Sequence, residues 1–371
     1  MAKLRIGVIY GGRSGEHEVS LMSAQSVLGA LDRSRYDVTE IGITPEGKWI
    51  AGEGVMQTLT TRSGKTPRAA MLAEPGPARI WEIQPNGGDE ELHLRICREV
   101  DVVFPVLHGT FGEDGTLQGL LEMAEVAYVG AGVLASSVAM DKALFKQLMR
   151  AHGIPMLEYI LCTRGEIAHD LEGVLRRAEE AAPYPFFTKP ANLGSSVGIS
   201  RCANRSDLVE GLAEAARYDR RVVIERGIDA REIEVSVLGN EKPEASVPGE
   251  VIPSREFYSY ESKYVDGTSQ LLIPAPLPEE KVREVQRMAV EAYRAIDGAG
   301  LSRADFLMDR KSGELYINEL NTMPGFTTIS MYPKLWEKTG LAYPALLDRL
   351  IELALERHAE RAKSERSFRK N

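Results

Sequence analysis

The chain has 371 residues, of which 43% are hydrophobic and 27% charged, an ordinary composition for a globular protein of two or three domains. Its formal net charge of −9 argues against broad binding to nucleic acids or anionic membranes, because both depend on clustered Lys and Arg. We therefore expect neither a nucleic acid nor a membrane as a partner.

The cysteines and the apolar segments indicate the cellular compartment. Cys97, Cys162 and Cys202 lie far apart and form no C-x-x-C pair, which argues against a disulfide framework or a zinc knuckle. The N-terminal run MAKLRIGVIY lacks the pattern of a signal peptide. No stretch approaches the ~18–20 apolar residues of a membrane span. These features predict a reduced, cytoplasmic enzyme.

A strand, a glycine-rich turn and a helix open the chain. Leu4–Tyr10 is a short apolar run, residues 11–16 are rich in glycine, and residues 17–31 have helical spacing. This arrangement is typical of a doubly wound parallel sheet. Glu18 falls in the first turn of the helix, where it either stabilises the helix end or binds the ammonium group of a substrate.

A second buried strand is predicted at Val100–Leu107, followed by a glycine-dense loop at 108–115. Loops at the carboxyl ends of parallel strands often carry function. His108 therefore either orders this loop through a hydrogen bond or contacts the substrate. Residues 45–95 are weakly patterned and predict an irregular excursion with short strands.

The segment Gly130–Ala135 matches G-x-G-x-x-A and supports an alternative function, an NAD-type oxidoreductase. However, it lies at the end of the first predicted sheet and not in the opening unit, where that fingerprint normally occurs. An amphipathic helix is predicted at 136–151, carrying Asp141 and Lys142, and the first domain boundary is expected nearby.

The middle of the chain predicts a hairpin with a tip suited to phosphate. A strand at 184–190 ends near Lys189, the tip at 191–198 is rich in Gly and Ser, and a second strand follows at 197–200. Small residues allow backbone N–H groups to approach phosphate closely, and a hairpin tip can close as a lid. After a helix at 206–218, the strand Arg221–Glu225 could bind an adenine at its exit.

Two strands near the C-terminus predict a metal site. Leu301–Arg310 and Glu314–Asn321 alternate in polarity and are joined by a three-residue loop that ends in glycine. In that register Asp305 lies opposite Glu319 and Arg303 opposite Asn321, all on one face. Opposed carboxylates need a cation, and this oxygen-rich set suits Mg²⁺ completed by nucleotide phosphates. The alternative is a hairpin whose charges face water.

Nine segments together resemble the ATP-grasp enzymes and, within them, the D-alanine–D-alanine ligase family. The segments occur in the family's order and span essentially the whole chain: GGRSGEHEVS (11–20), LHGTFGEDGTLQGLLE (107–122), MDK (140–142), TKPANLGSSVG (188–198), IER (224–226), REIEV (231–235), YESKY (260–264), RADF (303–306) and NELNTMPGFT (318–327). One such motif alone would be weak evidence.

This resemblance implies an α/β (α+β) fold of three domains. A doubly wound parallel sheet is expected in an N-terminal substrate-side domain at 1–137. A central lid domain at 138–228 and a C-terminal catalytic domain at 229–371 are expected to clasp ATP between them. The family is commonly homodimeric, so a homodimer is expected, and the 45–95 excursion is interpreted as a subtype feature that could lie at its interface.

The resemblance also implies roles for residues at matching positions. The residues expected to bind ATP are Lys142, Lys189, Ser196, Glu225, Arg226, Ile228, Glu232 and Asn318. Those expected to hold two Mg²⁺ ions, which Mn²⁺ can replace, are Asp305, Glu319 and Asn321. Those expected to contact substrate are Glu18, His108, Lys263, Tyr264, Arg303, Ser330 and Met331. Catalytic roles are expected for Glu18, Ser195, Tyr264, Arg303 and Gly325.

The implied reaction joins two D-alanines through a D-alanyl phosphate, for peptidoglycan precursor synthesis. Arg303 and the N–H of Gly325 are expected to face the oxyanion, and Ser195 and Tyr264 are expected to link the closed lid to Glu18. Tyr264, assisted by Ser195, is a candidate base for the second amine. Relatives that join D-alanine to D-lactate typically lack this tyrosine, so Tyr264 favours the dipeptide, and the D-lactate ligase is the alternative.

Overall fold

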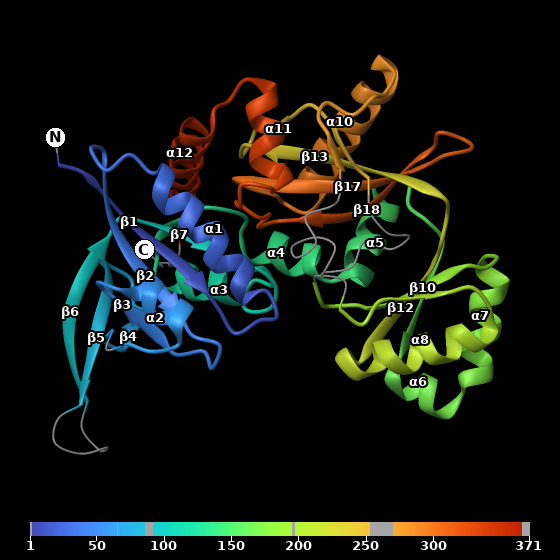
Figure 1. Cartoon of the computed structure of the whole chain (residues 1–371), viewed down its shortest axis with the longest axis horizontal. Coiled ribbons are helices and arrows are strands. Elements are labelled where there is room, and N and C mark those ends of the chain that lie inside the picture. The colour runs from blue at the N-terminus through green and yellow to red at the C-terminus, as the bar shows by residue number, and fades with distance from the viewer. Residues whose placement is uncertain (1, 65, 86–91, 195–196, 253–269, 366–371) are drawn as a thin grey trace, which may run out of the picture.

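The computed structural model describes residues 2–64, 66–85, 92–194, 197–252 and 270–365 (Figure 1). These residues form four sheets with helices packed on their faces, which confirms the expected α/β class. Among the described residues, none of the helices is long and apolar enough to cross a membrane.

The first sheet is parallel apart from one edge strand. Its order is β3-β2-β1-β7-β8, and only β3 runs antiparallel to its neighbour. The strands are β1 (Leu4–Gly11), β2 (Tyr36–Ile43), β3 (Trp49–Ala51), β7 (Val102–Val106) and β8 (Ala127–Tyr128). Helices α1 (His17–Ala30) and α12 (Tyr343–Arg361) cover one face, and α3 (Thr116–Met123) covers the other. The predicted doubly wound sheet is therefore confirmed.

The predicted excursion forms a small sheet of its own. It follows helix α2 (Val55–Thr61) and has the order β4-β5-β6. The strands are β4 (Ala69–Met71), β5 (Ala78–Pro85) and β6 (Leu92–Val100). Ala69, Met71 and Ile80 pack into the apolar cluster that covers the α3 face of the first sheet.

The central sheet has the order β11-β10-β12-β9 and is antiparallel throughout. Its strands are β9 (Tyr159–Thr163), β10 (Phe186–Pro190), β11 (Ser200–Cys202) and β12 (Arg221–Arg226). One face packs on α7 (Leu171–Ala181) and α8 (Arg205–Tyr218), next to the short helix α6 (Arg164–His169). The opposite face packs on α5 (Lys142–Ala151).

The third large sheet has the order β16-β15-β13-β17-β18, with β14 paired to β13. Its strands are β13 (Ala230–Leu238), β14 (Glu244–Ala245), β15 (Gly249–Ile252), β16 (Gln270–Leu272), β17 (Leu301–Asp309) and β18 (Leu315–Asn321). Alternate residues of β13, β17 and β18 form an apolar core with α10 (Glu279–Ala295). The other residues of these strands present polar and charged side chains on the opposite face.

The single helix predicted at 136–151 is wrong, because the structure contains two helices there, α4 (Val133–Met140) and α5. Asp141 separates them with an extended backbone, and its Oδ1 accepts hydrogen bonds from the N–H groups of Ala143 and Leu144. This side-chain cap begins a new helix. Lys142 is consequently the first residue of α5.

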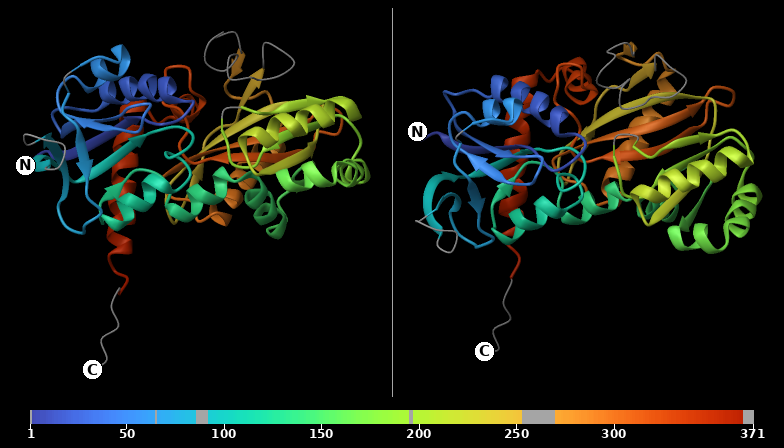
Figure 2. Two further views of the ribbon diagram at one scale, coloured as in Figure 1. Left: turned by 90° about the horizontal axis from the view of Figure 1, so that it is seen from below. Right: turned by 60° about the horizontal axis from the view of Figure 1, so that its bottom comes forward.

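The C-terminal helix packs against the N-terminal part of the molecule. Helix α12, preceded by α11 (Met331–Thr339), continues to Arg361 because Arg357 and Arg361 both form ion pairs with Glu122 at the end of α3. Figure 2 shows this red C-terminal helix lying against the blue N-terminal part of the molecule. The C-terminal helix therefore belongs to the N-terminal core.

Shortening a buried side chain of α12 tests this assignment. Leu350 is 1% exposed in the shared core, whereas Leu355 on the same helix is 38% exposed. We expect Leu350→Ala to lower the free energy of unfolding by about 2–5 kcal/mol and Leu355→Ala to change it much less. Urea denaturation followed by circular dichroism measures both. Equal losses for the two variants would contradict the packing described.

Candidate functional site

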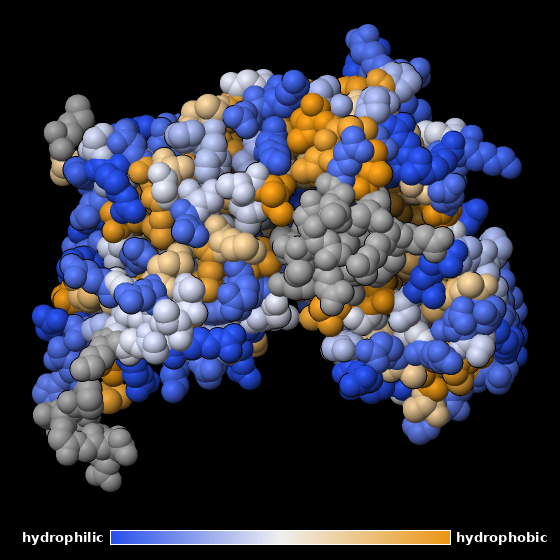
Figure 3. All heavy atoms as spheres, viewed as in Figure 1, coloured by the Kyte–Doolittle hydropathy of each residue, from blue (hydrophilic) through white to orange (hydrophobic). Residues whose placement is uncertain are grey.

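A cavity lies where the loops of the first sheet, the tip of the β10–β11 hairpin and the β17–β18 hairpin meet. Figure 3 shows an open notch between the N-terminal part, on the left, and the central part, at the lower right. The charged and polar residues that line the cavity are Glu16, Glu113, Lys142, Glu234, Arg303, Glu319, Asn321, Thr322 and Ser330. Seven of the predicted site residues line it: Lys142, Arg303, Glu319, Asn321, Gly325, Ser330 and Met331.

The β17–β18 hairpin has the predicted register at the end that faces the cavity. Asp305 pairs with Glu319 and Arg303 pairs with Asn321. Beyond Asp305 a β-bulge shifts the register, so Phe306 pairs with Ile317. The uniform register expected for the whole hairpin is therefore wrong, since Asn318 is the extra residue of the bulge.

Two cations compensate the acids on this face, Arg303 on the same strand as Asp305 and Lys142 on helix α5. The guanidinium of Arg303 donates to both carboxylate oxygens of Asp305 at 2.7 Å, and its Nε lies 3.0 Å from Glu234 Oε2. Glu234 is directly opposite Asp305 on β13. Lys142 Nζ lies 3.8 Å from Glu319 Oε2. Three carboxylates, those of Glu234, Asp305 and Glu319, thus lie close together on this face. Arg303 and Lys142 neutralise their charges.

The donor atoms on this face fit a hard divalent cation. Asp305 and Glu319 supply opposed carboxylates, and the Oδ1 of Asn321 accepts a hydrogen bond from the Met323 N–H at 3.1 Å. Oxygen ligands of this kind suit Mg²⁺, which usually completes its coordination with phosphate and water. The predicted metal residues are therefore compatible in chemistry and placement with Mg²⁺.

A second cluster, next to the cavity, contains the other predicted lysine. Lys189 forms an ion pair with Glu225, and its Nζ donates to Asn318 Oδ1 at 3.3 Å. Glu225 also forms an ion pair with Lys146, which the sequence did not single out. Lys142 joins the lid to the site by donating to the Leu193 carbonyl at 2.8 Å. The predicted nucleotide residues Lys189, Glu225 and Asn318 are thus brought together.

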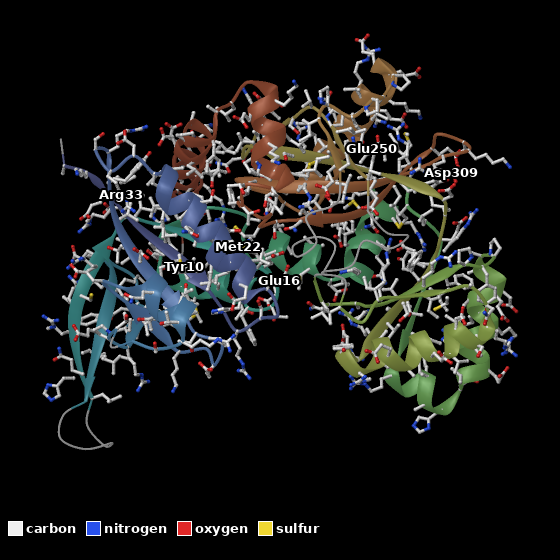
Figure 4. The ribbon with its side chains drawn as sticks, viewed as in Figure 1. Tyr10, Glu16, Met22, Arg33, Glu250 and Asp309 are labelled. Atoms are coloured by element: carbon white, nitrogen blue, oxygen red, sulfur yellow. The ribbon has the colours of Figure 1, made fainter. Side chains whose placement is uncertain are left out.

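The predicted substrate residue Glu18 does not reach the cavity. Its side chain is 63% exposed and lies 3.6 Å from Arg62. Glu16, the last residue before α1, lines the cavity instead, and Figure 4 shows it at the end of the helix nearest the centre of the molecule. A Cβ atom at Gly109 would lie 2.7 Å from Glu16 Oε2, and one at Gly194 would lie 3.1 Å from the same oxygen. The Glu16 carboxylate therefore lies against the second glycine loop and the lid.

His108 orders the loop around Gly325. His108 Nδ1 lies 3.0 Å from the Met323 carbonyl, and Nε2 lies 3.0 Å from Ser23 Oγ. The same Ser23 Oγ accepts the Phe326 N–H at 3.2 Å. Of the two roles left open by the sequence, this geometry supports loop ordering, because both ring nitrogens are engaged with the protein.

The remaining predicted residues fall into three groups. Arg226 is half-buried and lies 3.2 Å from Glu158, and Ile228 follows it on the loop between β12 and β13. Glu232 shares the polar face of β13 with Glu234. Ser195, Ser196, Lys263 and Tyr264 lie outside the described residues.

The sequence analysis missed Glu16, Glu113, Glu234 and Lys146. Burial raises the pKa of Glu113, the charge of Glu16 raises it further, and His108 opposes both effects. Glu16 and Glu113 both follow strands of the first sheet, so their position after β1 and β7 was a usable signal. Glu234 was detectable as the acid two residues after Glu232 on an alternating strand. No signal in the sequence distinguished Lys146 from an exposed helical lysine.

Removing the Ser23 hydroxyl tests the link between α1 and the Gly325 loop. Ser23→Ala leaves the Phe326 N–H and His108 Nε2 without this partner in a buried position, so we expect a loss of about 1–3 kcal/mol in unfolding free energy. Ser26, on the same helix, bonds the Tyr343 hydroxyl at 3.1 Å in a partly buried position, and Ser26→Ala is the matched control. Urea denaturation measures both, and a Ser23→Ala loss no greater than the control's would refute the link.

Comparisons with known proteins place the chain in one family. Residues 5–131 match the family model described as "D-ala D-ala ligase N-terminus", and residues 148–352 match the one described as "D-ala D-ala ligase C-terminus". The D-alanine–D-alanine ligase of Heliobacterium modesticaldum is 52% identical over 98% of both chains. That of Natranaerobius thermophilus is 48% identical over 99% of both.

Solved structures give the same result. The structure of the D-alanine-D-alanine ligase from Coxiella burnetii has a TM-score of 0.80 and 36% identity, and the match covers 98% of this chain and 97% of that one. The VanG D-Ala:D-Ser ligase of Enterococcus faecalis also has a TM-score of 0.80, with 33% identity over 95% of this chain and 100% of that one. The chain belongs to the D-alanine–D-alanine ligase family.

Proposed function

We propose that the chain is an ATP-dependent ligase that joins two D-alanines through a D-alanyl phosphate, for peptidoglycan precursor synthesis. The observation that carries this proposal is the cavity that brings Glu319 and Asn321 of the β17–β18 hairpin together with Arg303, Gly325, Lys142 and Glu16. The close relatives named D-alanine–D-alanine ligase support the same reaction.

In the first step, a carboxylate oxygen of one D-alanine attacks the γ-phosphorus of ATP, and ADP leaves. Phosphoryl transfer depends on positioning and on neutralising charge. Lys142 and Lys189 contact the phosphates, while Asp305, Glu319 and Asn321 would hold two Mg²⁺ ions, or Mn²⁺ in their place. When bound, the metal neutralises charge on the transferring group. Glu16, in the place that the sequence assigned to Glu18, pairs with the ammonium of this D-alanine.

In the second step, the amine of the other D-alanine attacks the acyl carbon, phosphate leaves, and the nitrogen loses a proton, for which Tyr264, assisted by Ser195, is the proposed acceptor. The tetrahedral intermediate carries an oxyanion, which Arg303 and the N–H of Gly325 stabilise. Ser330 and the start of α11 at Met331 bind the carboxylate of the second D-alanine. Gly325 allows close approach here, because a Cβ at this position would lie 2.7 Å from Ser330 Oγ.

The broader organisation follows the same proposal. The proposed domains are 1–137, 138–228 and 229–371, and the first, central and third large sheets each lie within one of these ranges, while α12 belongs to the third range by sequence and packs in the core of the first sheet. The enzyme acts in the cytoplasm as a homodimer, as is common in the family. The resemblance assigns Ser196 to ATP binding and Lys263 and Tyr264 to substrate binding, and these residues lie outside the described part of the chain.

The oxidoreductase alternative loses its only support in the structure. A Cβ at Gly132 would lie 2.6 Å from Arg357 of α12, and one at Gly300 would lie 3.1 Å from the Gly130 backbone. The glycine-rich segment is therefore packed against protein. We reject the dinucleotide site on this ground.

Product analysis tests the proposed reaction. Incubation with Mg-ATP, D-alanine and D-lactate is expected to yield D-alanyl-D-alanine as the main product, with ADP release that requires D-alanine and stops when the metal is chelated. Mass spectrometry identifies the product. ADP release that does not depend on D-alanine would contradict the ligase assignment. A depsipeptide as the main product would establish the D-lactate alternative.

The acid that binds the first D-alanine is tested by a matched pair of variants. Glu16→Gln keeps the shape of a cavity-lining side chain but loses its charge, so we expect KM for D-alanine to rise by about tenfold or more. Glu18→Gln removes the same charge two residues away on the exposed side of α1 and is expected to change KM less than about threefold. The opposite ranking would restore the assignment of Glu18.

A further inference from the structure

Lys146 is a fully buried lysine next to the nucleotide cluster. It lies one turn after Lys142 on α5, and its side chain is 1% exposed. The α5 helix packs on the face of the central sheet that carries Glu225 and Lys189. Lys146 pairs with Oε1 of Glu225, while Lys189 pairs with Oε2. One buried carboxylate is thus held between two ammonium groups.

The charges in this cluster are strongly coupled. Burial alone would raise the pKa of Glu225, but the charges of Lys146 and Lys189 outweigh it and lower the pKa to about 2. Glu225 is therefore ionised at neutral pH although it is only 2% exposed. Burial lowers the pKa of Lys146, and the charge of Glu225 opposes this effect. An ionised carboxylate at such a site is stable only while it is paired.

The two lysines differ in what else they can reach. Lys189 also donates to Asn318 Oδ1 on β18, so its ammonium lies between the central and the third large sheets. Lys146 lies deeper, with its Nζ 5.6 Å from the centre of the Tyr159 ring on β9. Only Lys189 is placed to turn from Glu225 toward a phosphate group. If Glu225 had no other cation, that movement would leave its charge buried and unpaired.

We propose that Lys146 is a positioning residue that keeps Glu225 compensated, so that Lys189 is released to bind the nucleotide phosphates. The inference rests on the proposed function, because it assigns Lys189 to ATP. Lys146 itself does not contact the nucleotide. Its effect on ATP affinity is therefore conditional on the negative charge of Glu225.

A double-mutant cycle tests this condition, with ATP affinity measured by titration calorimetry. In the wild-type background, Lys146→Met removes the cation that would remain with Glu225 when Lys189 turns to the nucleotide, and we expect Kd for ATP to rise by about tenfold or more. In a Glu225→Gln background the carboxylate is neutral, so Lys146→Met is expected to change Kd less than about threefold. An equal effect in both backgrounds would overturn the proposal, because Lys146 would then act on fold or nucleotide directly.

Two controls separate this role from a structural one. Arg150 is an exposed residue of the same helix, and its Cζ lies 4.9 Å from the centre of the same Tyr159 ring. Arg150→Met therefore removes a nearby positive charge that does not pair with Glu225, and we expect it to change Kd for ATP less than about twofold. KM for D-alanine in Lys146→Met is expected to stay within about twofold of wild type, and a rise equal to that in Kd for ATP would overturn the proposal.

The test remains decisive if Lys146→Met does not fold alone. The Lys146→Met/Glu225→Gln variant carries no unpaired acid, so it is expected to fold and to match Glu225→Gln in ATP affinity. A much weaker affinity in the double variant would refute the proposal. Failure of the proposed function is recognised separately, because ADP release by the wild-type protein would then not depend on D-alanine, whatever the ATP affinities of the variants.

Discussion

The structure around the cavity depends on pairing closely spaced acids with cations from other elements. Asp305 and Glu319 oppose each other across two strands, and Glu234 lies beside them. Carboxylates so placed would destabilise their own sheet if they were left alone. Arg303 on β17 and Lys142 on α5 compensate them, and Glu225 is compensated by Lys146, also on α5, and by Lys189 on β10. These pairs of acids and cations stabilise the folded chain. They also hold α5, the central sheet and the third large sheet together around the cavity.

The N-terminal part fixes the other end of the β17–β18 hairpin. Phe326, which follows Gly325, is fully buried and packs edge-on against Phe104 of β7, with ring centres 5.9 Å apart. Its carbonyl accepts a hydrogen bond from the Tyr343 hydroxyl at 3.4 Å, and its N–H is bonded to Ser23. The backbone proposed to bind the oxyanion is thus positioned by Tyr343 and by two residues, Phe104 and Ser23, that lie more than two hundred positions away in the sequence.

The sequence predicts the strands of the site well, because their signals are local. Alternation along two strands and a short glycine loop are enough to place Asp305 opposite Glu319. The bulge at Asn318 also had a local signal that the interpretation overlooked, because two polar residues, Asn318 and Glu319, separate the buried Ile317 and Leu320 where strict alternation allows one. Glu18 was proposed without considering Glu16, and the structure places Glu16 at the cavity and Glu18 on the exposed side, because two positions at a helix start nearly reverse the direction of a side chain. The ion pairs of Arg357 and Arg361 of α12 with Glu122 had no local signal, because they join elements that are far apart in the sequence.

The place of α12 in the N-terminal core has a consequence for how the chain folds during synthesis. The first sheet is translated early, but the face covered by α12 remains exposed until residues 343–361 have been made. An N-terminal domain would ordinarily fold as a unit ahead of those that follow it. The first sheet is therefore completed only after the two large sheets that follow it in the sequence, and its apolar face stays uncovered until α12 has been made.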